Sequence, residues 1–293
     1  MKLEQGVIGE LNWKVYLGDC KDVLQEMINN KEFVDTIMTS PPFFNRRSYA
    51  GKPKIDGNIA KWIYASQGNP IKGEIGNTKD KDKYIKDIEE VLQLCYGVLR
   101  DNRFMFINIA NTHENFEVID FSSNFIEIAK KIGFIHWDTL IWIKKNPQPA
   151  GKHKAYYLAN GWEYILAFTK GKKNKINTEQ LKVKTHFKCK YCQEENYIDS
   201  QITPNYLYSY VGCYGRTEKS NITHPAKFPI DIPKFCLSMS SKVGYTILDP
   251  FAGSGTTLIA GLEQGLNVIG CELVANIYDD LIYRMNSLSE KNE

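Results

Sequence analysis

The sequence predicts an α/β protein with a seven-stranded, mostly parallel sheet that is covered by helices on both faces. The first observation is that short apolar runs alternate along the chain with longer segments of helical period. The second is that seven such runs are present, interleaved with helices, as in sheets covered on both faces. The third is size, because a chain of 293 residues that is 43% hydrophobic can bury a sizeable core.

Seven apolar runs are predicted to be strands. In chain order they are WKVYLGD (13–19), VDTIMTS (34–40), RFMFINIA (103–110), DTLIWIKK (138–145), WEYILAFTK (162–170), YTILDPF (245–251) and NVIGCEL (267–273). Helices are predicted between most of them, over 21–30, 80–99, 121–132, 231–241, 255–264 and 275–287. In the segment 80–99 the apolar residues fall on one face of an amphipathic helix, namely Tyr84, Ile88, Val91, Leu92, Cys95 and Leu99.

Two stretches interrupt this alternation. Residues 45–79 are rich in Gly, Lys and Asn and show no clear period, which predicts a long mobile loop. Residues 171–222 are basic at first and then rich in tyrosine, which predicts an inserted recognition segment. We therefore expect one domain, formed by residues 1–170 and 223–293, that is interrupted by the insert 171–222.

Composition excludes several classes of protein. No stretch approaches the roughly 18 apolar residues that a membrane helix requires, and the first ten residues lack the apolar core of a signal peptide. The seven cysteines are odd in number and mostly scattered. We therefore expect a cytoplasmic protein with free thiols and no membrane partner.

The net charge of +3 conceals a strong asymmetry. Residues 144–190 hold twelve lysines against Glu163 and Glu179 only, whereas the other 246 residues carry 25 basic and 32 acidic side chains. Such a segment is either a solvated lysine-rich loop or a polyanion-binding face. Interleaved aromatic residues favour nucleic acid, because they can stack on bases. They are Tyr156, Tyr157, Trp162, Tyr164, Phe168, Phe187 and Tyr191.

The strand at 34–40 runs directly into Ser40-Pro41-Pro42-Phe43. Proline cannot donate to a strand ladder, fixes its own φ and restricts the residue before it, so the strand must stop abruptly. The simplest interpretation is an edge strand that is ended by prolines. The functional interpretation is a site that needs a hydroxyl group, a rigid carbonyl and an aromatic face in one place.

The second chemical stretch is ILDPFAGSGTTLIAG, residues 247–261. A strand leads into Asp249-Pro250, a glycine turn follows at Gly253-Ser254-Gly255, and a helix then begins. This order lets a cofactor approach bare backbone at a helix N-terminus. Seventeen residues after Gly255 a further strand ends at Glu272, whose carboxylate suits the two hydroxyls of an adenosine ribose.

Three kinds of cofactor could bind at this turn. A phosphate-loop nucleotide needs a lysine after the glycines, but Thr256 and Thr257 follow Gly255. A dinucleotide needs a third glycine, but Leu258 occupies that position. S-adenosylmethionine has a ribose and no phosphate, so close backbone approach and an acid suffice. A purely structural turn is the remaining alternative.

The two motifs together resemble a known family. TSPPF (39–43) followed by DPFAGSGT (249–256) is similar to the amino-methyltransferases of DNA, specifically the N4-cytosine type of restriction–modification systems. The resemblance extends to YLGDC (16–20), GVLRDNRFMFINIA (97–110), LIWIKKNPQP (140–149), EYILAFTKG (163–171) and HPAKFP (224–229). The motif order is that of the permuted group, with its recognition region between AFTKG and HPAKFP. Arg103 departs from the pattern, since the family more often has glycine there.

This resemblance implies a Rossmann-like methyltransferase fold that uses S-adenosylmethionine, and double-stranded DNA as the partner. Ser40 and the carbonyl of Pro41 would accept the hydrogens of an exocyclic amine, with the rigidity of Pro42 holding them in place. Phe43 would stack on a base flipped out of the duplex. The resemblance leaves open whether a cognate restriction endonuclease exists and whether the chain is a monomer or a homodimer.

Serine in the motif favours cytosine N4, whereas adenine N6 enzymes of the family normally carry Asp or Asn there. The two amines are chemically close, so adenine N6 stays an alternative. Cytosine C5 methylation needs a Pro-Cys dipeptide, and this sequence has none. Two remote alternatives are a nicotinamide-dependent oxidoreductase and a DNA-binding module without catalysis.

The resemblance also assigns cofactor roles by position. The methionine part would lie against Asp249, Phe251, Gly253, Gly255 and Thr256, and Glu272 would hold the ribose. Asp19 and Cys20 match the segment that meets the adenine, although Asp19 equally suits a plain turn after a strand. The segment that closes the pocket beside the amino acid is matched by His224, Pro225 and Lys227.

DNA contacts are expected from two groups of residues. Asn45, Arg46, Arg47 and Tyr49 follow the catalytic motif and would hold phosphates, unless they form a plain basic loop. Lys172, Lys173 and Lys175 would track the phosphate backbone from the insert. Cys189 and Cys192 have metal-ligand spacing, with His186 and Cys213 as further candidates, but the second pair of a zinc site is missing and no metal is predicted.

Overall fold

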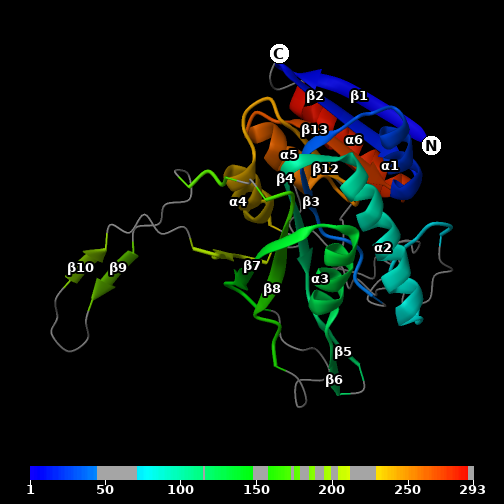
Figure 1. Cartoon of the computed structure of the whole chain (residues 1–293). Helices are drawn as coiled ribbons and strands as arrows, with labels where there is room; N and C mark the ends of the chain where they lie inside the picture. Colours follow the sequence, from blue (N-terminus) through cyan, green and yellow to red (C-terminus); the bar gives the residue numbers. More distant parts are fainter. Residues whose placement is uncertain are drawn as a thin grey trace, which may run out of the picture.

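A nine-stranded sheet runs through the computed structural model of this chain (Figure 1). The structure describes residues 1–44, 71–114, 116–147, 158–172, 175–178, 185–188, 195–198, 204–211 and 229–289. The strand order is β1-β2-β13-β12-β3-β4-β8-β7-β11. The bounds are β1 Lys2–Ile8, β2 Leu11–Leu17, β3 Val34–Thr39, β4 Leu99–Ile109, β7 Ile135–Lys144, β8 Trp162–Lys170, β11 Tyr206–Ser209, β12 Thr246–Asp249 and β13 Asn267–Glu272.

Most of these strands run in one direction. The pairs β2–β13, β13–β12, β12–β3, β3–β4 and β7–β11 are parallel. Within the described sheet, β1 and β8 run opposite to their neighbours. Two small antiparallel pairs lie outside it, β5 (Thr112–Glu114) with β6 (Glu117–Ile119), and β9 (Thr185–Lys188) with β10 (Glu195–Ile198).

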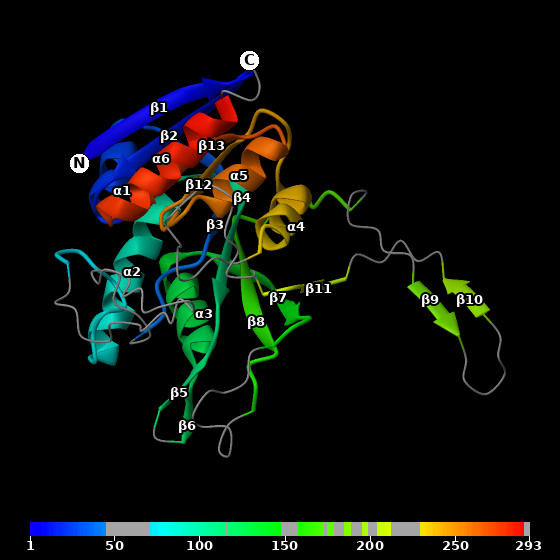
Figure 2. The same cartoon turned by 180° about the vertical axis from the view of Figure 1, so that it is seen from behind.

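Two layers of helices cover the sheet (Figures 1 and 2). On one face α1 (Cys20–Asn29), α2 (Lys81–Val98) and α3 (Phe121–Ile132) contribute to one hydrophobic cluster. On the other face α4 (Asp231–Ser240), α5 (Thr256–Glu263) and α6 (Ala275–Ser289) contribute to the second cluster. No described helix combines the length and the apolar character needed to span a membrane.

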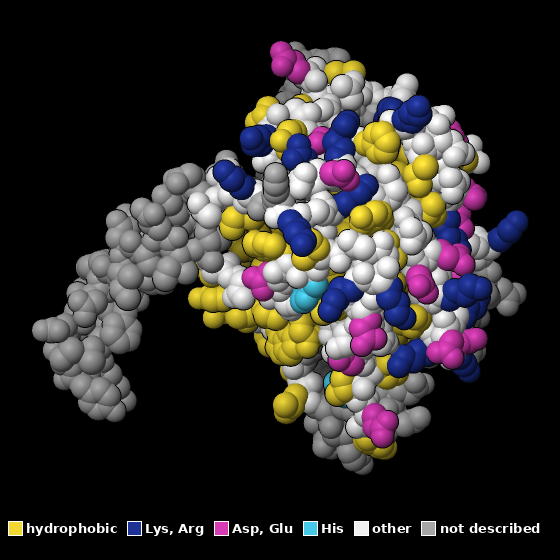
Figure 3. Space-filling view, in the orientation of Figure 1, with side chains coloured by type: hydrophobic (Ala, Val, Ile, Leu, Met, Phe, Trp, Pro, Cys, Tyr) yellow, Lys and Arg dark blue, Asp and Glu magenta, His cyan; other side chains and the backbone are white. Residues whose placement is uncertain are grey.

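The predicted elements are present with small shifts at their ends. All seven predicted strands and all six predicted helices belong to this architecture. Two strands of the sheet were not predicted, because their sequences lack a continuous apolar run. These are β1, at one edge, and β11, at the other edge and inside the range 171–222 that also holds β9 and β10. The face in Figure 3 shows mixed charge over most of its area, with hydrophobic side chains gathered over β7 and β8.

Parallel strands bring their carboxyl ends to one edge of the sheet. Ser40 follows β3, Asp249 ends β12, Glu272 ends β13 and Asp19 follows β2. Residues from four separate places in the sequence therefore meet along one line, where open α/β sheets bind their ligands.

Candidate active site

The glycine turn between β12 and α5 has the backbone geometry that its sequence requires. Gly253 and Gly255 have φ values of +53° and +82°, which residues with a side chain rarely adopt. A Cβ atom on Gly255 would also collide with the side chain of Leu281 in α6. The partly buried guanidinium of Arg284, also in α6, donates to the carbonyl of Ser254. The turn is thus held both by its own glycines and by α6.

The N-terminus of α5 differs from those of α1, α2 and α3. Those three helices are capped by the carboxylates of Asp19, Asp80 and Asp120, respectively. In α5 the cap residue is Gly255, which has no side chain that could accept from the amide groups of the first turn. Amide groups of this first turn therefore remain available to a negatively charged ligand group, such as the carboxylate of a methionine.

Asp249 supports the turn from below. Its side chain is 1% exposed, and Oδ1 accepts from Thr39 Oγ1 at 2.6 Å and from the amide of Phe251 at 3.0 Å. Burial raises the pKa of this carboxyl to about 6, although those hydrogen bonds act in the opposite direction. Asp249 thereby ties the glycine turn to the end of β3, where the catalytic motif begins.

Glu272 lies at the end of the neighbouring strand β13. Its Oε1 accepts from the amide of Val274 at 2.8 Å, and burial raises the pKa of its carboxyl to about 7. The carbonyl of Glu272 accepts from the amide of Gly18 at 2.9 Å, which places Asp19 at the adjacent strand end. The buried carboxylate offers acceptors to the hydroxyls of a ribose, and the uncapped helix N-terminus offers donors to the carboxylate of an amino acid. Together they fit a ribose that is attached to an amino acid.

Asp19 and Cys20 have different surroundings. Asp19 is partly exposed, and its Oδ1 accepts from the amide of Lys21 at 2.9 Å as the cap of α1. Both interpretations of Asp19 are therefore compatible with its position, since the cap lies at the strand end beside Glu272. Cys20 is buried, and burial raises the pKa of its thiol well above the usual value, so the thiol is unreactive.

Ser40 is connected to a buried amide that the sequence analysis did not single out. Ser40 Oγ lies 3.5 Å from Asn108 Oδ1, and Asn108 Nδ2 donates to the carbonyl of Tyr164 in β8 at 3.1 Å. The Tyr164 carbonyl can only accept, so the amide nitrogen faces Tyr164 and the amide oxygen faces Ser40. Ser40 therefore donates its one proton to Asn108 and keeps its lone pairs for another donor.

The rest of the catalytic motif is fixed from α2 and α3. The hydroxyl of Tyr84, a fully buried residue of α2, donates to the carbonyl of Pro42 at 3.0 Å. Phe44, directly after the motif, packs against Tyr84 and Phe121 with ring centroids 5.6 and 5.4 Å apart. This clamp holds Ser40 and Pro41 in place without using their own polar atoms.

Residues 71–79, the part of the predicted loop 45–79 that the structure describes, lie against the motif from another side. A Cβ atom on Gly76, whose φ is +92°, would lie 3.0 Å from the carbonyl oxygen of Phe43. A Cβ atom on Gly73 would lie 2.7 Å from Asp19 Oδ2. This segment therefore touches both the catalytic motif and the acid that ends β2.

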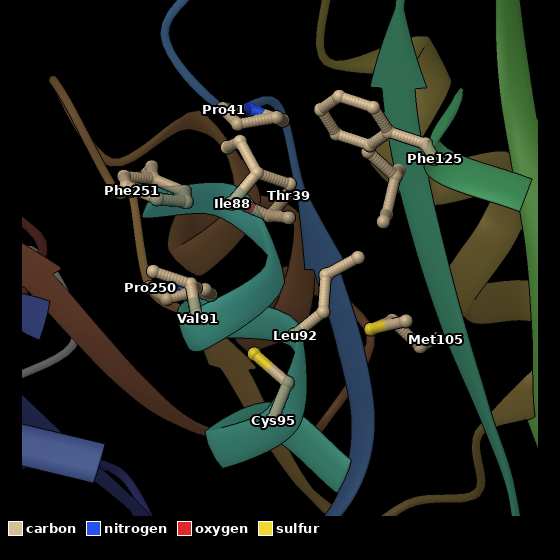
Figure 4. A pocket seen from close by; sticks show the side chains of 11 residues that line it. Thr39, Pro41, Ile88, Val91, Leu92, Cys95, Met105, Phe125, Pro250 and Phe251 are labelled. Atoms are coloured by element: carbon tan, nitrogen blue, oxygen red, sulfur yellow. The ribbon is translucent and has the colours of Figure 1, made fainter. Parts of the chain in front are cut away.

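A small pocket shows how closely the two sequence motifs approach each other (Figure 4). Thr39 and Pro41 line it from the catalytic motif, and Pro250 and Phe251 line it from the turn. Its remaining walls are apolar side chains from α2, β4 and α3, namely Ile88, Val91, Leu92, Cys95, Met105, Ile107 and Phe125. The pocket is therefore the apolar floor between the motifs, and the polar groups lie above it at the strand ends.

The basic segment is only partly available for binding. Lys144 pairs with Glu163 at 2.8 Å, with both side chains largely buried, and Lys170 donates to the carbonyls of Tyr96 and Leu99. These two lysines are held by the protein itself, and Phe168 is fully buried in the core. Lys172 and Lys175 are exposed.

Several predicted site residues lie outside the described part of the chain. They are Asn45, Arg46, Arg47, Tyr49, Lys173, His224, Pro225, Lys227, Cys189, Cys192 and Cys213, and the side chain of His186 is also not described. Their assignments stay predictions.

Three residues of the site were missed from the sequence. Asn108 had a signal, because it is a polar residue inside the apolar run FMFINIA. Tyr84 had none, since an aromatic residue on the buried face of a helix suits ordinary core packing equally well. Arg284 also had none, since a single arginine in an amphipathic helix is usually solvated.

Comparison with known proteins agrees with this geometry. The family described as DNA methylase (N6_N4_Mtase) matches residues 34–283. The chain is 28% identical to the type II methyltransferase M.MjaI of Methanocaldococcus jannaschii, over 89% of this chain and 87% of the relative. It is 24% identical to the type II methyltransferase M.BglII of Bacillus subtilis, over 94% of this chain and 69% of the relative.

The fold is shared with solved structures. The M1.HpyAVI–SAM complex matches with a TM-score of 0.60 and 20% identity, covering 94% of this chain and 99% of that chain. The PvuII DNA methyltransferase (cytosine-N4-specific) matches with a TM-score of 0.63 and 14% identity, covering 96% of this chain and 92% of that chain. The predicted Rossmann-like methyltransferase fold is thereby confirmed.

Proposed function

The chain belongs to the DNA methylase family, and from this premise we propose that it methylates the exocyclic N4 amine of a cytosine in duplex DNA. The methyl donor is S-adenosylmethionine. The observation that carries the N4 assignment is the hydroxyl of Ser40, which Asn108 orients as a neutral acceptor. The resemblance to N4-cytosine enzymes, which have serine in this motif, supports the same choice over adenine N6.

The donor and the target base have separate places in the proposed site. When bound, S-adenosylmethionine supplies a sulfonium methyl group that a nitrogen lone pair can attack. Glu272 binds the ribose hydroxyls, and the first turn of α5 binds the carboxylate of the methionine part. Phe43 lies beside Ser40 and Pro41 and stacks on the base that leaves the duplex.

The acceptors act on the amine before and during transfer. The lone pair of a cytosine N4 amine is delocalised into the ring, so the amine is a poor nucleophile. Ser40 Oγ and the carbonyl oxygen of Pro41 each accept one N–H, which favours the pyramidal geometry in which the lone pair is localised. Because both acceptors are already fixed by Asn108 and by the proline backbone, no reorganisation is needed when positive charge develops on the nitrogen.

The surroundings of Ser40 also determine where the proton goes. The N–C bond forms as the S–C bond of the methyl donor breaks, which would leave a neutral thioether and a nitrogen with one proton too many. Ser40 cannot pass a proton on to Asn108, because a side-chain amide oxygen is not a base near neutral pH. The excess proton therefore leaves to solvent.

Product analysis tests this proposal directly. Duplex DNA from cells that express the protein is digested to nucleosides, and the modified nucleosides are identified by mass spectrometry. We expect N4-methylcytosine, and negligible methyl transfer to free cytosine in vitro, because the binding energy of the flanking DNA would be missing. N6-methyladenine as the product would overturn the cytosine assignment but keep the DNA methyltransferase.

A further inference from the structure

An exposed surface of aromatic side chains covers one end of the sheet. We call it the aromatic face, and define it as Trp162 of β8, Tyr206 and Tyr208 of β11, and Tyr210 just beyond β11. Their exposed fractions are 46%, 41%, 57% and 61%, respectively. Contiguous exposed apolar surface of this kind usually marks a binding site.

The register of the strands places these rings on the same side. Tyr208 pairs with Ile143 of β7, and Ile143 pairs with Trp162 of β8, so the three side chains form one row. The rings of Tyr206 and Tyr208 make an edge contact, with centroids 5.7 Å apart. Figure 3 shows hydrophobic side chains gathered over this part of the sheet.

The alternate residues of β11 point to the opposite side. Leu207 packs in the hydrophobic cluster of α4 to α6, and Ser209 donates to Asp231 of α4 at 2.5 Å. These two contacts attach β11 to the helices on that side of the sheet. The tyrosines are therefore not required as core residues of this strand.

The aromatic face lies at the same sheet edge as the catalytic motif. Asn108, which orients Ser40, is paired with Ile165 of β8, and Trp162 is three residues further towards the edge. At about 3.4 Å per residue, this is about 10 Å along the strand. Trp162 also contacts Tyr164, whose carbonyl holds Asn108, with ring centroids 4.6 Å apart. A nucleotide a few positions from the target base can span such a distance.

The charge of the aromatic face favours a polyanion. Lys145 Nζ lies 5.2 Å from the centre of the Tyr210 ring. Near Lys145, the described residues on this side of the three strands are uncharged, namely Ile141, Ile143, Trp162, Tyr164, Tyr206 and Tyr208. The nearby carboxylate of Glu163 is paired with Lys144. A second copy of this surface would thus offer Lys145 no carboxylate, whereas DNA offers phosphates and bases together.

We propose that the aromatic face is a stacking platform for an unpaired base of the DNA substrate, close to the base that enters the active site. The inference rests on DNA as the substrate. A base inside a duplex is already stacked on both sides, so only a base that has left the stack can take an aromatic ring. Removal of the target base from the helix leaves its former pairing partner on the opposite strand unpaired, so that this base is free to leave the stack.

Two single-stranded probes of equal charge test the platform without knowledge of the recognition sequence. One is oligothymidylate, and the other is an abasic oligomer of the same length, which has the phosphates but no bases. We expect the wild-type protein to bind oligothymidylate roughly ten-fold tighter, the usual scale of stacking on one base. Tyr208→Ala should bind oligothymidylate more weakly than the wild type does, with an unchanged affinity for the abasic oligomer and an unchanged dependence on salt.

Controls separate this role from folding. Tyr283→Ala changes an equally exposed tyrosine of α6 outside the aromatic face and should keep the preference for bases. Tyr208→Ala should keep the wild-type affinity for S-adenosylmethionine and the wild-type melting temperature, because Tyr208 is mostly exposed.

Three results would overturn the inference. The first is equal binding of both probes by the wild-type protein, and the second is a preference for bases that is as large in Tyr208→Ala as in the wild type. The third is that Tyr208→Ala keeps this preference but converts a dimer to a monomer in sedimentation, which would assign the aromatic face to a second copy. If the wild-type enzyme forms N4-methylcytosine but binds oligothymidylate and the abasic oligomer equally, the stacking platform is wrong and the proposed function stands.

Discussion

The two ends of the sheet are built in contrasting ways. At the proposed cofactor end, formed by β2, β12 and β13, Asp249 and Glu272 are buried and accept hydrogen bonds from neighbouring groups. At the substrate end, formed by β7, β8 and β11, Tyr208 and Tyr210 are more than half exposed. A small cofactor requires a preorganised site, whereas a large polymer covers part of its binding surface itself.

The catalytic motif lies between the two ends, after the central strand β3. It is tied to the cofactor end through Thr39 and Asp249, and to the substrate end through Ser40, Asn108 and the carbonyl of Tyr164. Substitutions in the catalytic motif, at the cofactor end and at the substrate end should therefore change mainly turnover, cofactor affinity and DNA affinity, respectively. The following predictions proceed from the largest expected effect to the smallest.

Ser40→Ala tests the point at which the two ends meet. We expect turnover on duplex DNA to fall by about 100-fold or more, the scale seen when one preorganised hydrogen-bonding group is removed from a transition state. The affinity for S-adenosylmethionine, measured by calorimetry, should stay near that of the wild type. Ser241→Ala, at the opposite edge of the sheet, is the matched control. Full turnover in Ser40→Ala would remove this hydroxyl from the mechanism.

Glu272→Gln tests the cofactor end. We expect a loss of about 1–3 kcal/mol in the binding of S-adenosylmethionine, because a charged acceptor of hydroxyl hydrogen bonds is replaced by a neutral one. DNA affinity should be unchanged. An equal cofactor affinity in both proteins would place the ribose acceptor elsewhere.

The raised pKa of Glu272, about 7, gives the same residue a signature in pH. In the wild type the cofactor should bind more weakly as the pH falls below about 7, since the carboxylate becomes protonated. The free energy of unfolding of the cofactor-free protein should change in the opposite direction and increase as the pH falls. A folded-state pKa above the ordinary 4.5 stabilises the fold fully below that value, and this contribution is lost as the pH rises through about 7. Urea unfolding of the wild type and of Glu272→Gln across this range measures the difference.

Replacement of Lys172, Lys173 and Lys175 by glutamine tests electrostatics at the substrate end. If all three contact phosphates, the dependence of DNA affinity on salt should flatten by up to about 3 in a plot of log K against log salt. Sequence preference should survive, because phosphate contacts position a protein and base contacts specify. The matched control replaces Lys31, Lys131 and Lys242, which are exposed and lie before β3, β7 and β12 at the opposite edge. An unchanged slope would direct the search to Arg46 and Arg47.

Tyr84→Phe should have the smallest effect. The variant removes the hydrogen bond to the carbonyl of Pro42 but keeps the ring that packs against Phe44 and Phe121. We expect kcat to fall about 3- to 10-fold, the scale of one buried hydrogen bond, with little change in the affinity for cofactor or DNA. In Tyr245→Phe, which loses a hydroxyl bonded to Arg103 away from the site, kcat should not change. A loss of cofactor affinity instead of kcat would assign Tyr84 to general packing.

The sequence indicated the cofactor end more completely than the substrate end. The turn at Gly253 and Gly255 depends on φ values that glycine adopts. The end of strand β3 before Ser40 depends on the prolines that follow it. Both features are therefore local properties of the chain. Glu272 was predicted as a cofactor ligand from its spacing from the turn along one strand–helix–strand unit. Alternating apolar and helical segments likewise predicted all seven inner strands and all six helices.

The remaining features depend on register between strands that are distant in sequence. Tyr206 and Tyr208 had no strand pattern, and they join Trp162 only because β11 pairs with β7 and β7 pairs with β8. The orientation of Ser40 depends on Asn108 and Tyr164, which lie 68 and 124 positions further along the chain. Similarly, Lys144 and Lys170 belong to the basic segment, but they are bonded to Glu163 and to the carbonyl of Tyr96 and are not free to bind DNA. Sequence alone thus predicted the backbone turns of the proposed cofactor site, because φ preferences are local. Only the tertiary structure decided which side chains are exposed at the proposed substrate end, because that depends on long-range pairing and burial.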